Sequence, residues 1–119
     1  MAKVLIADDQ ESMRIIIAGM LRESGHEVET VEDGRAAFDK LNAGSYDLVV
    51  ADVNMPKLNG LEFLAKVRET KPQQKVVFVT GLLEETVKLG SEKLGLNGLI
   101  LKPFDKTAAL EKITRILAQ

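Results

Sequence analysis

Acidic, hydroxyl and basic residues follow four short apolar runs of this sequence, each at the point where the run ends. They are Asp8-Asp9, Asp52, Thr80-Gly81 and Lys102-Pro103. Carboxylates can ligate a hard cation or act as nucleophiles, and a lysine, a hydroxyl and a glycine N–H can hold phosphoryl oxygens. If the fold brings these run ends together, they predict phosphoryl-transfer chemistry.

Three carboxylates, those of Asp8, Asp9 and Asp52, would repel one another if they converge. At about 4 Å and an effective dielectric constant near 20, each close pair costs on the order of 4 kcal/mol. Either one acid stays protonated or a cation binds. Mg²⁺ typically takes one or two carboxylates together with water and phosphate oxygens, so we expect a magnesium site here.

Lys102, the Thr80 hydroxyl and the backbone N–H of Gly81 suit an incoming phosphoryl group. Phosphoryl transfer depends on positioning and charge neutralisation more than on covalent catalysis. A carboxylate can itself be the nucleophile and form an aspartyl phosphate. We expect Asp52 to be this nucleophile because it follows the central apolar run, and the acid pair to hold the metal.

Five apolar runs predict the strands that must position these residues. The runs are Val4–Ala7, Val28–Val31, Leu48–Ala51, Val76–Val79 and Leu99–Leu101. Four of them are nearly continuous, which is typical of strands buried on both faces. The second alternates over Glu27–Val31 and predicts an edge strand.

Apolar residues with helical spacing separate the predicted strands. The first stripe, which stops at Gly25, consists of Met13, Ile16, Ile17, Met20 and Leu21. The second helix is expected to run from a cap at Asp33 to near Gly44, with Ala37 and Leu41 facing inward. The third is expected to end before Pro72, with Gly60, Phe63, Leu64 and Val67 on its inner face. The last helix carries Leu110, Ile113 and Leu117. Leu83–Leu94 predicts a helix that buries little, with inward positions Val87, Gly90, Ser91 and Leu94.

Five strand–helix units in succession predict an α/β fold with right-handed crossovers and a parallel sheet covered on both faces. A barrel needs eight strands, so the sheet is expected to be open and doubly wound. Residues 1–119 then form one domain, because no linker or repeat interrupts the pattern. Such sheets bind ligands outside the carboxyl ends of their strands, which is where the polar residues are expected.

The composition of these 119 residues excludes several other kinds of site. Without cysteine there is no thiol nucleophile, and a single histidine, His26, which we expect to be structural, rules out a multi-histidine metal site. The net charge of −2 disfavours direct nucleic-acid binding. No apolar run approaches the roughly 20 residues that span a membrane, and Met1 opens no signal-peptide pattern, so we expect a cytoplasmic protein.

Four motifs together resemble a known family, the receiver domain of bacterial two-component response regulators, and in particular the chemotaxis regulators. They are Ala7-Asp8-Asp9, Asp52-Val53-Asn54-Met55-Pro56, Thr80-Gly81 and Lys102-Pro103-Phe104, in this order over the whole chain. The resemblance implies a doubly wound (βα)5, flavodoxin-like three-layer sandwich with the sheet order 2-1-3-4-5.

The resemblance also implies a role for each motif residue. Asp52 would accept a phosphoryl group from the phosphohistidine of a sensor histidine kinase or phosphotransfer protein. Mg²⁺, or Mn²⁺, would be held by four ligands, namely Asp8, Asp9, Asp52 and the backbone carbonyl of Asn54. Thr80, Gly81 and Lys102 would hold the phosphoryl oxygens, and the Lys102–Pro103 peptide would be cis. Such a receiver catalyses only its own phosphorylation and slow dephosphorylation, and is not otherwise an enzyme.

The family transmits phosphorylation to a downstream protein through the surface of the fourth helix, fifth strand and fifth helix. Two positions depart from its pattern here: Leu99 replaces an aromatic switch residue, and Asn59 replaces an aspartate. Leu82 and Asn54 occupy positions that tune autodephosphorylation in the family.

Other interpretations remain beside this one. Asp8-Asp9 could be an N-cap and a first-turn acid of the helix that starts near Glu11, Asp52 a loop cap and Lys102 a solvated charge. A dehalogenase-like phosphatase would need a D-x-D pair where the first strand ends in D-D, and a flavodoxin-like cofactor site would need a Ser/Thr/Gly-rich loop there. A degenerate, unphosphorylated receiver is the third rival. The chain could be a stand-alone receiver or a domain of a larger protein.

Overall fold

The computed structural model describes residues 1–81 and 85–119, in which strands and helices alternate throughout. The strands are β1 (Lys3–Ala7), β2 (Glu27–Val31), β3 (Leu48–Ala51), β4 (Val76–Thr80) and β5 (Gly98–Leu101). The helices are α1 (Glu11–Glu23), α2 (Gly34–Ala43), α3 (Gly60–Thr70), α4 (Glu85–Lys93) and α5 (Lys106–Leu117). The strands are parallel in the order β2-β1-β3-β4-β5, which confirms the predicted fold class.

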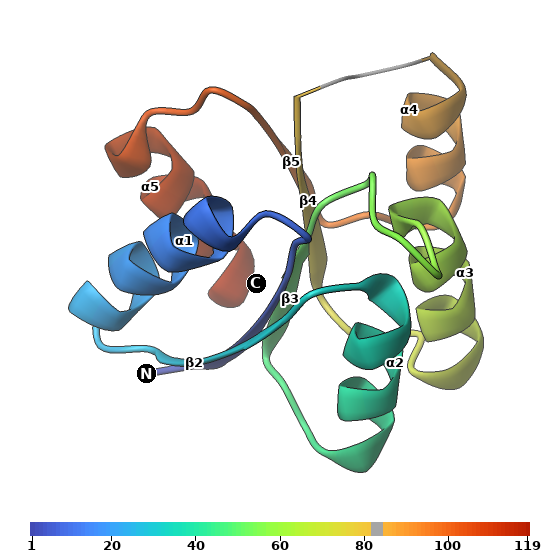
Figure 1. The fold of residues 1–119 in the computed structure, drawn as a ribbon, viewed down its shortest axis with the longest axis horizontal. Helices are drawn as coiled ribbons and strands as arrows, with labels where there is room; N and C mark the ends of the chain where they lie inside the picture. Colours follow the sequence, from blue (N-terminus) through green and yellow to red (C-terminus); the bar gives the residue numbers. More distant parts are fainter. Residues whose placement is uncertain (82–84) are drawn as a thin grey trace.

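The sheet is the middle of three layers (Figure 1). Helices α1 and α5 cover one face, and α2, α3 and α4 cover the other. Each face has its own apolar cluster, because alternate residues of a strand point to opposite sides. Val4–Ala7 and Leu48–Ala51 are at most 1% exposed, as continuous apolar runs predict for central strands.

Helix α1 buries a slightly different face from the one predicted. Ile17, Met20 and Leu21 are buried as expected, but Ile16 is 39% exposed and Ala18 lies in the core instead. Successive helical residues are about 100° apart, so one face cannot bury all three consecutive isoleucines. Met13 is only half-buried.

Helix α5 is likewise rotated by about one residue from its predicted face. Ala109, Ile113 and Ile116 are buried, whereas Leu110 and Leu117 are only partly covered. Helices α2 and α3 bury the predicted residues, which are Ala37, Leu41, Gly60, Phe63, Leu64 and Val67.

Helix α4 has a mixed surface in the part that the structure describes. Ser91 is buried, Leu94 is half-buried, and Leu89 is 50% exposed. A Cβ at Gly90 would lie 3.3 Å from Leu61, so the backbone of α4 packs closely on α3. Leu83 and the side chain of Val87 lie outside the described residues, and the expectations for them stay predictions.

Three helices begin with a side-chain cap and one does not, among those whose N-caps the structure describes. Asp33 and Asp105 accept from the N–H groups of Ala36 and Ala108, and Asn59 forms a capping box with Glu62. Gln10, at the N-cap of α1, makes no side-chain cap bond. Helix α1 ends as predicted, with Gly25 at φ 89° just beyond it.

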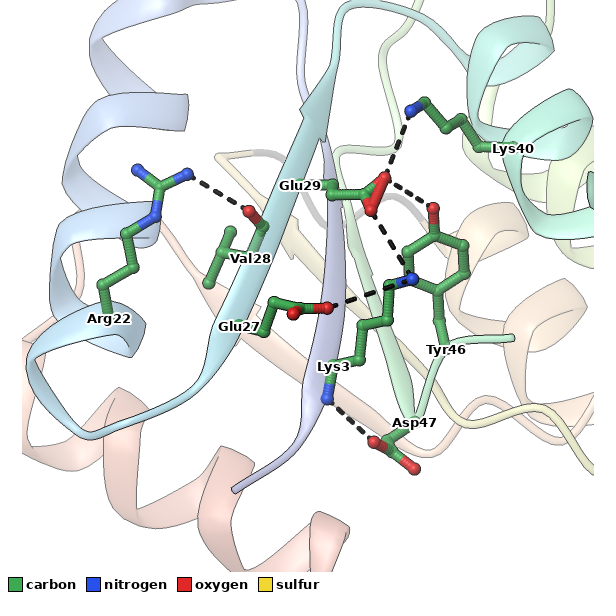
Figure 2. A network of polar contacts seen from close by, with 8 residues as sticks. All are labelled: Lys3, Arg22, Glu27, Val28, Glu29, Lys40, Tyr46 and Asp47. Atoms are coloured by element: carbon green, nitrogen blue, oxygen red, sulfur yellow. Dashed lines mark hydrogen bonds and ion pairs between the residues drawn. The ribbon is translucent and has the colours of Figure 1, made fainter. Parts of the chain in front are cut away.

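A network of polar side chains covers the edge strand β2 (Figure 2). Glu29 accepts from the Tyr46 hydroxyl at 2.8 Å and from Lys40 at 3.1 Å, and Lys3 lies 3.6 Å from the same carboxylate. Arg22 of α1 donates to the carbonyl of Val28 at 3.2 Å. Charged groups on an edge strand discourage pairing with another chain.

Two lysines of the loop between α3 and β4 attach it to neighbouring helices. Lys71 donates to the carbonyls of Leu41 and Gly44 at the end of α2, at 2.5 and 2.9 Å. Lys75 donates to two carbonyls at the end of α5.

His26 has the structural role predicted for it, since its Nδ1 accepts from the N–H of Ala2. None of the described helices is long and apolar enough to span a membrane.

Candidate functional site

The carboxyl ends of β1, β3, β4 and β5 bring the predicted site residues to one edge of the sheet. Asp52 donates its N–H to the carbonyl of Ala7 at 3.0 Å, which places it beside Asp8. Lys102 donates its N–H to the carbonyl of Thr80 at 2.8 Å. Backbone hydrogen bonds therefore place Asp52 beside Asp8 and Lys102 beside Thr80 at this edge of the sheet.

Lys102 forms an ion pair with each of two buried acids. Its Nζ lies 3.1 Å from Oδ2 of Asp52 and 3.3 Å from Oδ2 of Asp8. The lysine side chain is only 15% exposed, and the two carboxylate side chains are 9% and 2% exposed. The interpretation of Lys102 as a solvated surface charge is therefore wrong.

The other oxygen of each buried acid accepts a backbone N–H. Oδ1 of Asp52 accepts from Asn54 at 3.1 Å, and Oδ1 of Asp8 accepts from Gln10 at 2.9 Å. The N-cap residue of α1 is Gln10, so Asp8 and Asp9 are not its N-caps. Both buried carboxylates thus have fixed orientations.

The three acids form a cluster that could hold a metal ion. Asp8, Asp9 and Asp52 each offer an oxygen, and these oxygens lie within 4.8 Å of one another. Asp9 is exposed, so a bound ion could keep some of its water. Hard carboxylate oxygens with space for water suit Mg²⁺ or Mn²⁺, and the backbone carbonyl of Asn54 belongs to the same loop as Asp52.

The electrostatics of Asp8 agree with a site short of positive charge. Burial raises the pKa of the Asp8 carboxyl above its usual value, and the neighbouring charge of Asp52 raises it further. The Gln10 N–H and Lys102 lower that pKa, but by less than burial and Asp52 together raise it. One lysine therefore does not compensate the acids, and an added cation would favour their ionised forms.

An open pocket of about 370 Å³ lies over these groups. Among the described residues, its lining consists of Asp9, Gln10, Asp52, Asn54, Gly81 and Lys102. Thr80 is 1% exposed and is not among them. Every lining residue except Gln10 was predicted from the sequence to belong to the site. Gln10 could have been found from its position between the acid pair and the first predicted helix.

The remaining predicted residues lie close to this edge of the sheet. The Lys102–Pro103 peptide is cis, as the resemblance implies. Leu99 is half-buried and packs with the α2 and α3 side of the core. Asn59 keeps the capping function that an aspartate would have. Leu82 lies outside the described residues.

A larger open groove, of about 760 Å³, lies elsewhere on the molecule. It is lined by residues near the amino ends of the strands and the end of α5, among them His26, Tyr46, Lys71 and Leu117. It contains none of the predicted site residues. Chemical composition, rather than size, therefore distinguishes the pocket at the carboxyl ends.

Comparison with known proteins places similar sequences beside this chain. A family model described as the response regulator receiver domain matches residues 4–114. Chemotaxis protein CheY-3 of Vibrio cholerae is 33% identical over 117 residues, which are 96% of this chain and 90% of that protein. Chemotaxis protein CheY of Pseudomonas aeruginosa is 35% identical over 117 residues, with 96% and 94% covered.

Solved structures give the same result. Chemotaxis response regulator CheY4 of Vibrio cholerae matches with a TM-score of 0.90 and 34% identity, covering 98% of each chain. Response regulator TrrA of Thermotoga maritima, in complex with Mg²⁺ and BeF, matches with a TM-score of 0.89 and 30% identity. That alignment covers 98% of this chain and 99% of TrrA.

Proposed function

Because this chain belongs to the response regulator receiver domain family, we propose that it is a phosphoacceptor switch and that Asp52 is its phosphoacceptor. One observation carries the proposal. Asp52 is fixed at the end of a central strand, with Lys102 on one oxygen, two further acids within 4.8 Å, and an open pocket in front. Residues 1–119 would form one such receiver domain.

The proposed reaction moves a phosphoryl group from a phosphohistidine of a sensor histidine kinase or phosphotransfer protein. The P–N bond breaks, a P–O bond forms to the carboxylate of Asp52, and the imidazole takes up a proton. The hydrogen bond from Asn54 and the ion pair with Lys102 orient the Asp52 carboxylate for this attack. Transfer of this kind depends on such positioning and on charge neutralisation.

A divalent ion fits the donor set of the site. Asp8, Asp9, Asp52 and the backbone carbonyl of Asn54 would hold Mg²⁺ or Mn²⁺, which neutralises charge on phosphoryl oxygens when bound. The proposal is supported by the acid cluster and by the structure of the relative TrrA in complex with Mg²⁺ and BeF. Lys102 and the Gly81 N–H would contact the phosphoryl group from the other side of the pocket.

The output of the switch would be a change in the surface formed by α4, β5 and α5. Phosphorylation adds about −1.5 to −2 charge. Thr80 would move toward that charge, and Leu99 would adjust in place of an aromatic residue. A downstream protein would read the surface, in the cytoplasm and without direct contact to nucleic acid. Asn54 and Leu82 would tune a slow autodephosphorylation.

The test is incubation with acetyl phosphate and Mg²⁺, followed by intact-mass measurement. We expect the mass to rise by one phosphoryl group in the wild-type chain and not in D52N. Circular dichroism of D52N checks that the variant is folded. A wild-type mass that never shifts, or a shift of D52N to the same extent, would contradict the proposal.

The same material separates the phosphatase rival. A dehalogenase-like phosphatase would turn over a phosphate ester many times, whereas a receiver would show almost no such turnover. A pair of acids in D-x-D spacing does not occur at the end of β1, where Asp8 and Asp9 are adjacent.

A further inference from the structure

Gln10 is the pocket residue to which neither the sequence nor the family resemblance assigns a role. The other residues that line the pocket, within the described part of the chain, are two acids, a lysine, Asn54 and Gly81. Gln10 stands between Asp9 and the first residue of α1, and its side chain is exposed. Gln10 and the proposed phosphoacceptor Asp52 therefore line the same open pocket.

The main chain of Gln10 is fixed on both sides. Its N–H donates to Oδ1 of Asp8 at 2.9 Å, and its carbonyl accepts from the N–H of Arg14 at 3.1 Å, which begins α1. Its side chain thus leaves from a defined position at the rim of the pocket, next to a predicted metal ligand.

The side chain of Gln10 makes no capping hydrogen bond to α1, although Gln10 is the N-cap residue of that helix. The N-cap side chains of α2, α3 and α5 each accept a backbone N–H, and that of Gln10 accepts none. Serine, threonine, aspartate and asparagine stabilise this position, and glutamine is not among the preferred residues. Helix α1 therefore forgoes a capping bond at the one N-cap, among those described, that borders the pocket.

The carboxamide suits a group that carries phosphoryl oxygens. It has two N–H donors and no charge, so it can donate without adding to the repulsion among three nearby acids. An aspartate here would cap α1 but would bring a fourth negative charge to the pocket. A serine would cap α1 but would reach less far.

We propose that the Gln10 carboxamide donates a hydrogen bond to the phosphoryl group on Asp52 and so stabilises the phosphorylated state. This inference rests on the proposed function of Asp52. It makes Gln10 a binding residue for the phosphoryl group, at the expense of the stability of α1. A substitution of Gln10 by a good N-cap residue should therefore stabilise α1 and at the same time weaken binding of the phosphoryl group.

The test uses Mg²⁺ with beryllium fluoride as a phosphoryl mimic, titrated against the full chain by NMR of backbone amides. We expect Q10A to weaken binding about tenfold, which corresponds to the low end of the range for a hydrogen bond to a charged group. Q10S should weaken binding similarly while raising the urea midpoint, because serine restores the cap. S12A, on the exposed first turn of α1, is the matched control and should change neither.

Binding by both Q10A and Q10S within twofold of the wild-type affinity would overturn the inference. A rise in urea midpoint without a loss of binding in Q10S would show a capping position only, and would overturn it too. If the wild-type chain neither binds the mimic nor is phosphorylated on Asp52, the proposed function itself fails. The two failures are therefore distinguishable.

Discussion

Lys57 is the one described residue other than glycine that has a positive φ, and it lies in the loop that follows Asp52. Its φ is 69°, a left-handed conformation that asparagine and glycine adopt more readily than lysine. Its ion pair with Asp33 is 3.8 Å long and the lysine side chain is 72% exposed, so that pair contributes little. A different residue at position 57 could therefore raise the free energy of unfolding.

We predict that K57N raises the free energy of unfolding by about 0.5 kcal/mol, because asparagine relieves part of the strain. K66N is the matched control, since Lys66 lies within α3 and asparagine has a lower helix propensity there. It should lower the free energy by about 0.5 kcal/mol. Urea unfolding measures both values, and equal signs for the two variants would contradict the explanation.

The acids and lysine of the site were predictable from the sequence, but their partners were not. Asp8, Asp52 and Lys102 each follow a strand, and parallel strands bring their carboxyl ends to one edge. The backbone N–H of Gln10 and the carbonyls that bind Lys71 carry no signal of their own in the residue type. Such contacts depend on where loops turn, which neither periodicity nor composition specifies.

At the scale of elements, one side chain ties α3 to the segment between α4 and β5. Arg68 of α3 donates to the carbonyls of Leu94, Gly95 and Gln74 at 2.7, 2.9 and 2.7 Å. It also donates to the Asn97 side chain at 3.2 Å. Burial lowers the pKa of the Arg68 guanidinium, and all four of these acceptors are neutral.

We predict that R68K lowers the free energy of unfolding by about 2 kcal/mol, because a lysine cannot replace the fork and leaves carbonyls unsatisfied. R115K, at the exposed end of α5, is the matched control and should change it by less than about 0.5 kcal/mol. Urea unfolding gives both values. Hydrogen exchange of the Leu96 N–H, which donates to Ser91, should also speed up in R68K alone. Equal losses in the two variants would remove the special role of Arg68.

The edge strand β2 makes a prediction about pH. Burial and the hydrogen bond to Glu29 raise the pKa of the Tyr46 phenol to about 12 from a usual value of 10.0. A raised pKa means that the folded state holds the proton more tightly than the unfolded state. The stability that this contact contributes is complete below pH 10 and is lost as the pH rises toward 12.

Ultraviolet absorbance can follow this ionisation directly, because Tyr46 is the only tyrosine and the chain has no tryptophan. We expect a midpoint near 12 in the folded protein and near 10 in urea. E29Q keeps an acceptor without the charge and should lower the folded midpoint. A folded midpoint near 10, or one unchanged by E29Q, would contradict the assignment to Glu29.

The positions of the strands were predicted more accurately than the buried faces of the helices. All five strands were expected within a residue or two, because continuous apolar runs bounded by polar residues leave little choice. The faces of α1 and α5 were wrong by about one residue. Both helices carry more apolar positions than one face can bury, so packing against the sheet decides which of them, Ile16 and Leu117 included, lie at the edge.

At the scale of the whole molecule, the acid cluster links metal binding to global stability. Asp8, Asp9 and Asp52 come from two separate strand ends and lie beside a single lysine, so they converge only when the sheet is folded. An ion that binds this folded site and not the unfolded chain stabilises the fold by mass action. At a concentration 100 times its dissociation constant, the gain is about 2.7 kcal/mol.

We therefore predict that Mg²⁺ raises the free energy of unfolding of the wild-type chain by about that amount, and that D9N loses most of the gain. Asp9 is exposed, and the ion pairs of Lys102 are made with Asp8 and Asp52, so D9N leaves these buried pairs in place. Without Mg²⁺, D9N should be more stable than the wild type by about 0.5 kcal/mol, because one of the clustered negative charges is gone.

The control is E69Q, which removes an exposed acid at the end of α3; it should keep the full gain from Mg²⁺ and so controls for screening by salt. Urea unfolding at matched ionic strength measures all three chains. A wild-type chain that gains nothing, or an E69Q chain that loses as much as D9N, would mean that the acids do not form a metal site.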